Sequence, residues 1–585
     1  MKRREFIKKT GIVCAGLSML PVTGYANPKK LLLIGDQPNV AAAKNFYLED
    51  FGGKADGITD DGPAILLMIE AARAMKGKPV RLVFPNNKVI FAATGKDRYL
   101  FPLQHTKNIT VEGNGSTFLL DPQIRMMDLD YAKTPLIRNV KVDYTVTMFI
   151  ESVIEAVDAK GHYVDVKVLN SGDEQNLGGP TQQDGEQWFG GFVWCENAKH
   201  PKAARHYAVK GVKVLGDDRA RVFFDGQVIP KKITGAIKLG TTPFSIPRPG
   251  VAQRHGPGAL FNIHDTVDGH FENITVWAAP WFTFSIYRTE GTCRFINVNV
   301  MPKPGTNRLM AGCRDAFHVT GNRSKLIFDS CDTAGLGDDD YNFCILSSQI
   351  HKVVNPTEIV IRQKFPIQYN PMRVGETLMV MNSENQMVGS ARITAYQEQP
   401  NKDGSAIMPG GRTCPPITII LDKPIKGLAK DLHVWSKEAA NPDTTMKHCT
   451  ASFSIRMQTS LTIDRCTLTC YNTAYGFSSR TKNVEGPGPA FMRITNSEFH
   501  VGRSSGLVFK SAGKGPLEST RISNIHLENN TFHGPLKIDK AKDITLLNNK
   551  FYGNVKVDKY TTLKMRGNQH NGKPFTLPGA HQRMG

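Results

Sequence analysis

The segments FENITV (271–276) and FINVNV (295–300) decide the fold, because they repeat one pattern of apolar residues around an asparagine. Their central asparagines lie 24 residues apart, and a later pair, Asn529 and Asn548, lies 19 apart. A period of about twenty residues is one coil of a parallel β-helix, in which asparagine tolerates the left-handed backbone of tight turns. Leucine-rich repeats share the period, but their leucine spacing is absent. We therefore predict an all-β fold, a right-handed parallel β-helix.

A block that precedes the repeats, DFGGKADGITDDGPAI (50–65), resembles the start of pectate-lyase-like β-helix proteins. A helical pattern over 64–74 follows it, and then the strand-like VRLVFP (80–85). Asp60 or Asp61 could cap this helix. A helix here would cover the open end of the solenoid, where apolar core and strand edges are otherwise exposed. We predict an N-terminal capping helix and structural roles for the aspartates.

Two long stretches interrupt the repeat and have short alternating strands, which predicts two inserted, small β-barrel-like domains. The expected organisation is a signal peptide (1–26), the cap and first coils (27–122), a first insertion (123–250), catalytic coils (251–350), a second insertion (351–445) and C-terminal coils (446–585).

The N-terminal segment MKRREFIKK (1–9) carries paired arginines and precedes a weakly apolar stretch. Gly24 and Ala26 supply the small residues of a cleavage site. This pattern resembles a Tat export signal, so we expect a periplasmic or secreted protein; a basic cytosolic N-terminus is the alternative. No other segment has about eighteen consecutive apolar residues, so no membrane span is expected.

The chain is basic, with a net charge of +20 from 73 Lys and Arg against 53 Asp and Glu. Such a charge favours an acidic partner, and an anionic polysaccharide fits an exported protein better than nucleic acid, for which no motif is present. A basic surface without a polyanionic partner is the alternative. Ten cysteines without a CxxC pair argue against a disulfide framework or a zinc site. The sequence leaves a homo-oligomer possible.

The densest polar cluster consists of RDAFH (314–318) and GLGDDDYN (335–342). Asp315 precedes Asp338 by 23 residues, which is about one coil, and stacked strands lie about 4.8 Å apart. Carboxylates gathered in this way raise at least one pKa, so one acid stays protonated while another is ionised. Glycoside hydrolysis needs this combination. A calcium site, or solvated turn aspartates, is the alternative interpretation.

Three segments carry a family resemblance: HGPGALF (255–261), FENITVWAAPWFTFSI (271–286) and the run from NVNVMPKPG to DDDYN (297–342). Together they resemble glycoside hydrolase family 110. That resemblance implies an exo-acting, inverting α-1,3-galactosidase on a β-helix with barrel insertions. Family 28 polygalacturonases also use three aspartates, but their GHG and RIK signatures are absent here.

Carried over by position, the resemblance implies that Asp338 is the general acid and that Asp315 and Asp339 hold the attacking water. The residues implied to line the sugar site are Arg308, His318 and Asn342. This chain has DDDYNFC (338–344) where the family commonly has DDAIN, which leaves subsite specificity open. Asp340 is then a bystander.

Aromatic residues shortly before Asp315 are candidates for stacking on a sugar ring, namely Trp281 and Tyr287, with core packing as the alternative. Arg254, Arg288 and Arg480 are candidates for binding a sulfate or carboxylate, or for surface ion pairs.

The predicted function is therefore an exo-acting, inverting glycoside hydrolase that removes terminal α-1,3-linked galactose, with an anionic (sulfated) glycan as its partner. We expect no cofactor and no metal. A polysaccharide lyase acting on an anionic glycan, or a non-catalytic glycan-binding β-helix, remains the alternative.

Overall fold

The computed structural model describes residues 43–577, except 159, 179–189, 195–202, 225–236, 249–257, 346, 363–371, 383–385, 399–405, 408–412, 453, 471–476, 479–489, 502–506, 511–521, 559–560 and 576. The predicted signal peptide (1–26) and the candidate residues Arg254 and Arg480 lie outside these residues. Within the described ranges, no helix has the length and apolar character that a membrane crossing needs.

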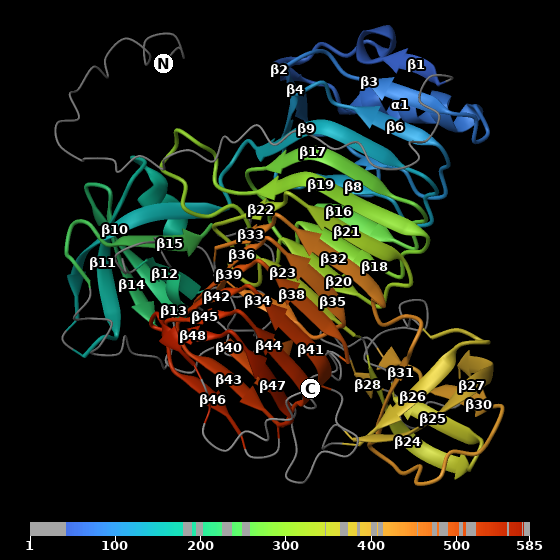
Figure 1. The fold of residues 1–585 in the computed structure, drawn as a ribbon. Helices are drawn as coiled ribbons and strands as arrows, with labels where there is room; N and C mark the ends of the chain where they lie inside the picture. The colour runs from blue at the N-terminus through green and yellow to red at the C-terminus, as the bar shows by residue number, and fades with distance from the viewer. Residues whose placement is uncertain are drawn as a thin grey trace, which may run out of the picture. The chain divides into compact units, whose positions relative to one another are not determined.

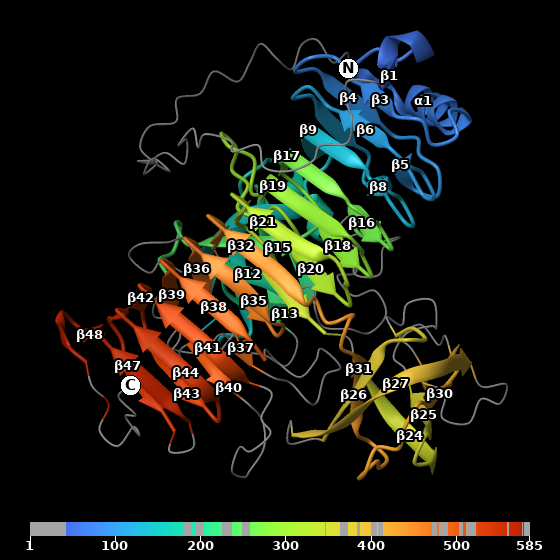
Figure 2. The ribbon, with the colours of Figure 1, turned by 45° about the vertical axis from the view of Figure 1, so that its right-hand side comes forward.

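Short parallel strands stack into three faces of a β-helix (Figures 1 and 2). The first face contains β1 (Lys44–Tyr47), β3 (Val80–Val83), β6 (Ile109–Glu112), β9 (Leu136–Tyr144), β17 (His270–Val276), β19 (Thr292–Val300), β21 (Lys325–Asp329), β32 (Asp443–Lys447), β35 (Leu461–Asp464), β38 (Met492–Thr495), β41 (Ser523–Glu528), β44 (Lys542–Leu547) and β47 (Leu563–Arg566). The predicted all-β parallel β-helix is confirmed.

The second face adjoins the first, and the long strands β9, β17 and β19 contribute to both. Its other strands are β2 (Asp56–Asp60), β4 (Val89–Ala92), β7 (Thr117–Leu120), β22 (Asp332–Thr333), β33 (Thr450–Ala451), β36 (Thr467–Cys470), β39 (Glu498–Val501), β42 (Thr531–His533), β45 (Lys550–Phe551) and β48 (Gln569–His570), with β49 (Lys573–Pro574) antiparallel to β48.

The third face consists of two consecutive sheets. The first contains β5 (Tyr99–Pro102), β8 (Arg125–Asp128), β16 (Phe261–His264), β18 (Phe284–Tyr287), β20 (Phe317–Thr320), β23 (Tyr341–Cys344) and β34 (Ile455–Met457). The second contains β37 (Phe477–Ser478), β40 (Leu507–Lys510), β43 (Leu536–Asp539) and β46 (Val555–Val557).

Aromatic side chains at equivalent positions of successive coils stack inside the solenoid. Phe261, Phe284, Phe317 and Tyr341 form one continuous stack with ring centroids 4.6, 5.1 and 5.2 Å apart. All four are fully buried. Because in-register pairing fixes the distance between coils, like side chains meet face to face and fill the core.

The asparagines of the repeat have the backbone conformation that the sequence predicts. Asn273, Asn297, Asn529 and Asn548 have φ angles of 52°, 52°, 56° and 54°. The Nδ2 of Asn297 donates to Oδ1 of Asn273 at 2.9 Å, one coil away. Their side chains therefore link coils as well as permitting the turn.

A second asparagine row, Asn530, Asn549 and Asn568, is buried inside the C-terminal coils. The Oδ1 of Asn549 accepts from the backbone N–H and from Nδ2 of Asn530, at 3.0 and 3.1 Å. Its Nδ2 donates to the Leu527 carbonyl and to Oδ1 of Asn568, at 2.8 and 3.0 Å. This row satisfies buried turn amides that solvent cannot reach.

The N-terminal end of the solenoid is covered by η3 (Leu48–Phe51) and α1 (Gly62–Ala74), whose buried residues join the main core. Asp61 accepts the amides of Lys54 and Ala55 at 2.6 and 3.0 Å. Asp60 accepts the Gly62 amide in the first turn of α1 at 3.0 Å. The helix agrees with the prediction, and both aspartates make structural contacts; the side chain of Asp61, the N-cap residue, makes no cap hydrogen bond to the helix.

Each of two insertions is a closed six-stranded barrel with its own apolar core. The first contains β10 (Phe149–Val157), β11 (Tyr163–Val168), β12 (Gly190–Trp194), β13 (Ala203–Gly216), β14 (Arg219–Phe224) and β15 (Pro243–Pro247), with η4 (Asp173–Gly178). The second contains β24 (Ser348–Asn355), β25 (Glu358–Arg362), β26 (Thr377–Met381), β27 (Met387–Glu398), β30 (Ile417–Leu421) and β31 (His433–Ser436), with the hairpin β28 (Ala406–Ile407) and β29 (Thr413–Cys414).

The first barrel begins later than residue 123, where the sequence analysis placed it. The strands β8 and β9 precede it, and both pair in parallel with neighbouring coils of the solenoid. The barrel is thus an insertion at the corner between the second and third faces, after β9 and before β16. The second barrel is inserted between β23 and β32, at the corner between the third and first faces.

Among the residues that the structure describes, seven cysteines are free and buried. They are Cys293, Cys313, Cys331, Cys344, Cys414, Cys449 and Cys466. The sequence analysis expected no disulfide framework, and none of these seven cysteines forms a disulfide.

Replacement of Asn549 tests the buried asparagine row. Asn549→Ala removes four hydrogen bonds and leaves buried amides and a carbonyl without partners, so we expect the free energy of unfolding to fall by about 2–4 kcal/mol. Urea unfolding followed by circular dichroism measures this. Lys550→Ala, at the exposed neighbouring position, is the control. Equal stability of the two variants would contradict a structural role for the row.

Candidate active site

The predicted acidic cluster lies on turns that lead from the second face into the third. Phe317 pairs with Tyr341, so the coil here is 24 residues long. Counting back along both strands places Asp315 level with Asp339 rather than with Asp338. The Ala316 amide donates to the Asp339 carbonyl at 3.1 Å, which fits this register. The 23-residue spacing was therefore one residue short of the true repeat.

The three carboxylates nevertheless converge, since Asp338 directly precedes Asp339. One oxygen from each of Asp315, Asp338 and Asp339 lies within 4.8 Å of the others. Asp315 and Asp339 are buried, whereas the side chain of Asp338 is 18% exposed. Asp338 is therefore the member of the cluster that solvent or a ligand reaches most readily.

A basic group faces each of these carboxylates. Arg314 Nη1 lies 2.8 Å from Asp338 Oδ2, and His318 Nδ1 lies 2.8 Å from Asp315 Oδ2. The contact with Asp339 comes from Arg456, whose Nε lies 3.2 Å from Oδ2. Three oxygens at this spacing could also hold a cation, but the cluster already has positive partners that offset its charge.

A row of polar side chains runs along the third face beside the carboxylates. In-register pairing places Asn262, Ser285, His318, Asn342 and Arg456 on successive coils. Asn342 Nδ2 donates to Asp339 Oδ2 at 3.3 Å. The predicted residues His318 and Asn342 therefore contact the cluster directly, and Arg456 extends the same row.

The next coil fixes the acidic turn through Ser454. Its Oγ donates to Asp339 Oδ1 at 2.6 Å, and its amide donates to Asp340 Oδ2 at 2.7 Å. Asp340 is fully buried. It therefore anchors the turn, whereas Asp338 stays accessible.

Burial and mutual repulsion raise the pKa of two of the three carboxyls. Burial and then the Asp338 charge raise the pKa of Asp315, against the opposing effect of His318. Burial raises the pKa of Asp339 to about 8, although Arg456 opposes it; the charges of Asp338 and Asp315 add to the increase. The cluster therefore retains a proton at neutral pH, shared among interacting groups.

The aromatic candidates differ in their surroundings. Trp281 stacks against Arg314, whose Cζ lies 4.8 Å from the ring centroid. Tyr287 is only 7% exposed and lies under Arg288, whose guanidinium is paired with Asp265. Trp281 therefore contacts the arginine of the acidic cluster, while Tyr287 has the burial expected of core packing. Sugar stacking by either ring stays a prediction.

Arg308 makes an ion pair that the sequence analysis did not anticipate. Its Nη1 lies 2.6 Å from Oδ1 of the buried Asp143, to which Lys303 also binds at 2.9 Å. Arg308 thus joins the loop before the acidic cluster to β9. Its contact with a sugar stays a prediction.

Arg456 and Ser454 were missed because the second barrel separates them from the acidic turn in sequence. Tyr341 pairs with Ile455, 114 residues later. SFSIRM (452–457) is thus the coil that follows DDDYNF (338–343). The alternation of apolar and polar residues in this segment predicts a strand. The sequence does not show that this strand pairs with the strand after the acidic turn, so it did not connect the segment to the site.

The fold and the cluster define a parallel β-helix with a buried carboxylate site on one of its turns. No known protein-family model matches the chain. It is similar to an alpha-1,3-galactosidase B of Bacteroides thetaiotaomicron, with 23% identity over 343 residues that cover 55% of this chain and 54% of that protein. It is also similar to an alpha-1,3-galactosidase A of Shewanella woodyi, with 23% identity over 367 residues, 58% of this chain and 55% of the relative. The chain thus spans about half the length of these curated relatives.

Among solved structures, an exopolygalacturonase from Thermotoga maritima aligns over 91% of this chain and 93% of its own, with 12% identity and a TM-score of 0.34. The A-module of a mannuronan C-5 epimerase from Azotobacter vinelandii aligns over 90% and 99%, with 11% identity and a TM-score of 0.30.

The raised pKa of Asp339 predicts a specific pH dependence of stability. Its carboxyl has a pKa of about 8 in the folded protein but the ordinary pKa of about 3.8 when the chain is unfolded. The stabilisation is therefore complete below about pH 4 and is lost as the pH rises to about 8. The neutral amide of Asp339→Asn does not titrate.

We therefore expect the unfolding free energy of Asp339→Asn, relative to the wild type, to increase between pH 4 and pH 8. Urea unfolding at several pH values measures this difference, with Asp97→Asn as the control for loss of one exposed carboxyl. A difference that does not change with pH would contradict a protonated Asp339.

Proposed function

We propose that this protein is an exo-acting, inverting glycoside hydrolase that removes terminal α-1,3-linked galactose. The observation that carries the proposal is the convergence of Asp315, Asp338 and Asp339 within 4.8 Å at an accessible turn. Cleavage of a glycosidic bond needs one carboxyl that keeps a proton and one carboxylate that is ionised. The similarity to proteins named alpha-1,3-galactosidase supports the choice of sugar and linkage.

Asp338 is proposed as the general acid because it is the exposed member of the cluster. Arg314 Nη1 lies 2.8 Å from Asp338 Oδ2, and in this proposal Asp338 receives the proton for the glycosidic oxygen when substrate binds. Asp339, which holds a proton at neutral pH, is close enough to supply it. The glycosidic oxygen of the substrate would take the place of Arg314 beside Asp338 and receive this proton from Asp338.

Asp315 and Asp339 are proposed to hold and activate the attacking water. His318 and Asn342 each contact one of these carboxyls and lie next to each other in the polar row. They can therefore orient the carboxyls and also meet sugar hydroxyls. Arg456 offsets the charge that Asp339 acquires when it loses its proton.

The net charge of +20 supports an anionic, sulfated or uronate-bearing glycan as the substrate. The twin arginines near the N-terminus support export to the periplasm or the exterior, where such glycans occur.

Substitution of Asp338 tests the catalytic proposal. We expect Asp338→Asn to lower kcat by roughly 10²–10⁴-fold, because an amide cannot donate the proton. The assay is a screen of the purified protein against galactose-terminated oligosaccharides, neutral and sulfated, with galactose release as the readout. Asp97→Asn, an exposed control, should keep full activity.

Retained hydrolysis in a folded Asp338→Asn protein would contradict the acid role. An unsaturated product that absorbs in the near ultraviolet would identify a lyase instead. Binding without any product would identify a glycan-binding protein.

The stereochemical outcome is a separate test, because the spacing and the resemblance point in different directions. Inverting pairs of carboxyls typically lie about 6.5–9.5 Å apart and retaining pairs about 5–5.5 Å apart. The nearest oxygens here lie within 4.8 Å. We expect inversion, with one water held by two carboxyls rather than placed between an acid and a base on opposite sides. NMR of the first-formed galactose decides it, and the α-anomer as first product would contradict inversion.

A further inference from the structure

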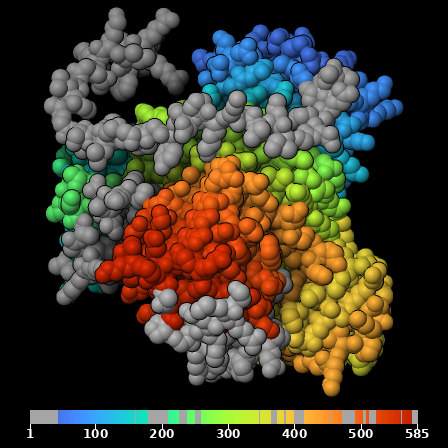
Figure 3. Space-filling view, viewed as in Figure 1, coloured from blue at the N-terminus to red at the C-terminus, as the bar shows by residue number. Residues whose placement is uncertain are grey.

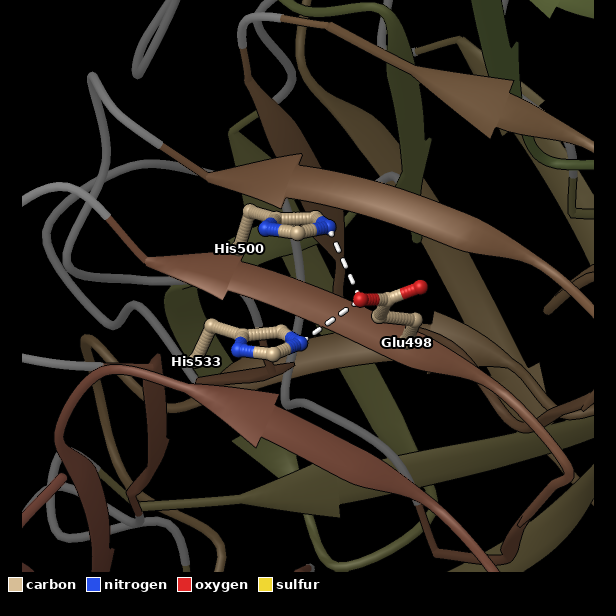
Figure 4. A group of neighbouring side chains, drawn as sticks. All are labelled: Glu498, His500 and His533. Carbon is tan, nitrogen blue, oxygen red and sulfur yellow. Dashed lines mark hydrogen bonds and ion pairs between the residues drawn. The ribbon is translucent and has the colours of Figure 1, made fainter. Parts of the chain in front are cut away.

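A cluster of two histidines and one glutamate lies on the second face of the C-terminal coils, separate from the carboxylate site (Figure 4). Glu498 and His500 are two residues apart on β39, so their side chains project from the same face of the strand. His533 on β42 pairs in register with His500. Two adjacent coils thus contribute three potential ligands to one point.

The edges of both imidazoles are directed at the same carboxylate oxygen. His533 Nε2 lies 2.6 Å from Glu498 Oε1, and His500 Nε2 lies 3.3 Å from it (Figure 4). All three potential ligand atoms lie within 4.8 Å of one another. Zinc bound to nitrogen at about 2.0–2.1 Å in a tetrahedron separates its ligands by about 3.3 Å. Small side-chain rotations therefore suffice to place an ion between them.

The rings are held in place by stacking. The His500 and His533 rings are parallel, with centroids 4.7 Å apart, and Tyr552 stacks on His533 at 5.2 Å. Directly after His533, Gly534 adopts a φ of 129°, and a Cβ there would lie 2.6 Å from the Val501 carbonyl. The coils are therefore packed too tightly at this corner for the strand ends to shift freely.

Stacking also limits how the cluster can bind a ligand. The rings of His500, His533 and Tyr552 cover one another's facing sides, so a sugar cannot stack between them. The nitrogen edges and the carboxylate are accessible, with side-chain exposures of 21% for His500, 38% for His533 and 43% for Glu498. The C-terminal coils, coloured orange to red, form part of the surface in Figure 3. Water can therefore complete the coordination of an ion.

We propose that Glu498, His500 and His533 form a binding site for a divalent transition-metal ion of the zinc class. Imidazole nitrogens together with one carboxylate suit zinc, nickel and copper, whereas calcium and magnesium prefer oxygen ligands throughout. Each imidazole binds through Nε2 and carries its proton on Nδ1. Bonds from the ion to all three side chains replace the hydrogen bonds between the two histidines and Glu498. Because these bonds join two coils, the ion stabilises the C-terminal part of the solenoid.

The test is zinc binding to the full-length protein, purified without a histidine tag, treated with EDTA and dialysed. Isothermal titration with zinc chloride should give one ion per chain. His533→Ala and Glu498→Gln should each weaken binding by at least about 100-fold, since even loss of a supporting outer-shell group costs 10–100-fold. Glu498→Gln preserves the shape of the side chain, so it guards against an effect of misfolding. Zinc should raise the melting temperature of the wild type and of neither variant.

Two control variants separate this site from other candidates. His526→Ala removes a histidine that pairs with one glutamate, Glu528, at 2.9 Å, and should leave zinc binding intact. Asp338→Asn alters the carboxylate cluster and should also leave it intact. No zinc binding by the wild type, or equal binding by folded His533→Ala, would overturn the proposal. Loss of binding in Asp338→Asn alone would assign the ion to the carboxylates instead.

Discussion

In-register parallel pairing of successive coils is the constraint on which the rest of the structure depends. It places each residue over its equivalent in the next coil, one strand spacing of about 4.8 Å away. Apolar positions become stacks such as Phe261, Phe284, Phe317 and Tyr341. Polar positions inside the turns become rows of asparagines, whose side chains form hydrogen bonds with backbone N–H and C=O groups of neighbouring coils. A side chain that suits one coil therefore suits the next, and the repeat follows from the spacing.

The same constraint would make a column of carboxylates unstable, and the acidic site shows how the chain accommodates one. Asp315 and Asp339 are level with each other on successive coils. At the preceding position of each turn, Arg314 is level with Asp338, so a positive side chain meets a negative one there. His318, three residues after Asp315 on the same coil, and Arg456, from the next coil, contact Asp315 and Asp339. Burial raises the pKa of Asp339 although Arg456 opposes it, and the charges of Asp338 and Asp315 add to the increase. The stacked coils thus hold a carboxyl that keeps its proton at neutral pH.

Features that depend on neighbouring coils could be predicted from the sequence, and features that depend on distant segments could not. The spacing of the asparagines predicted the β-helix, and the acidic cluster was found because one short coil separates Asp315 from Asp339. Arg456 was missed because the second barrel makes two adjacent coils 114 residues apart. The start of the first barrel was placed too early, although LIRNVKV (136–142) carries the asparagine of the repeat. Asn139 indeed has a φ of 57° and accepts from Asn273 Nδ2.

The first barrel takes part in shaping the acidic turn. It is inserted at the corner between the second and third faces, the same kind of corner that carries the three aspartates. Glu151 on β10 accepts the amides of Leu309 and Met310 at 3.0 and 3.2 Å, in the loop that leads to Asp315. Burial raises the pKa of Glu151 to about 7. Hydrogen bonds from these amides and from the Ser245 hydroxyl offset the cost of burying this carboxyl. Because Glu151 belongs to a strand of the barrel and binds this loop, the barrel constrains the position of Asp315. The insertion is therefore a structural part of the site.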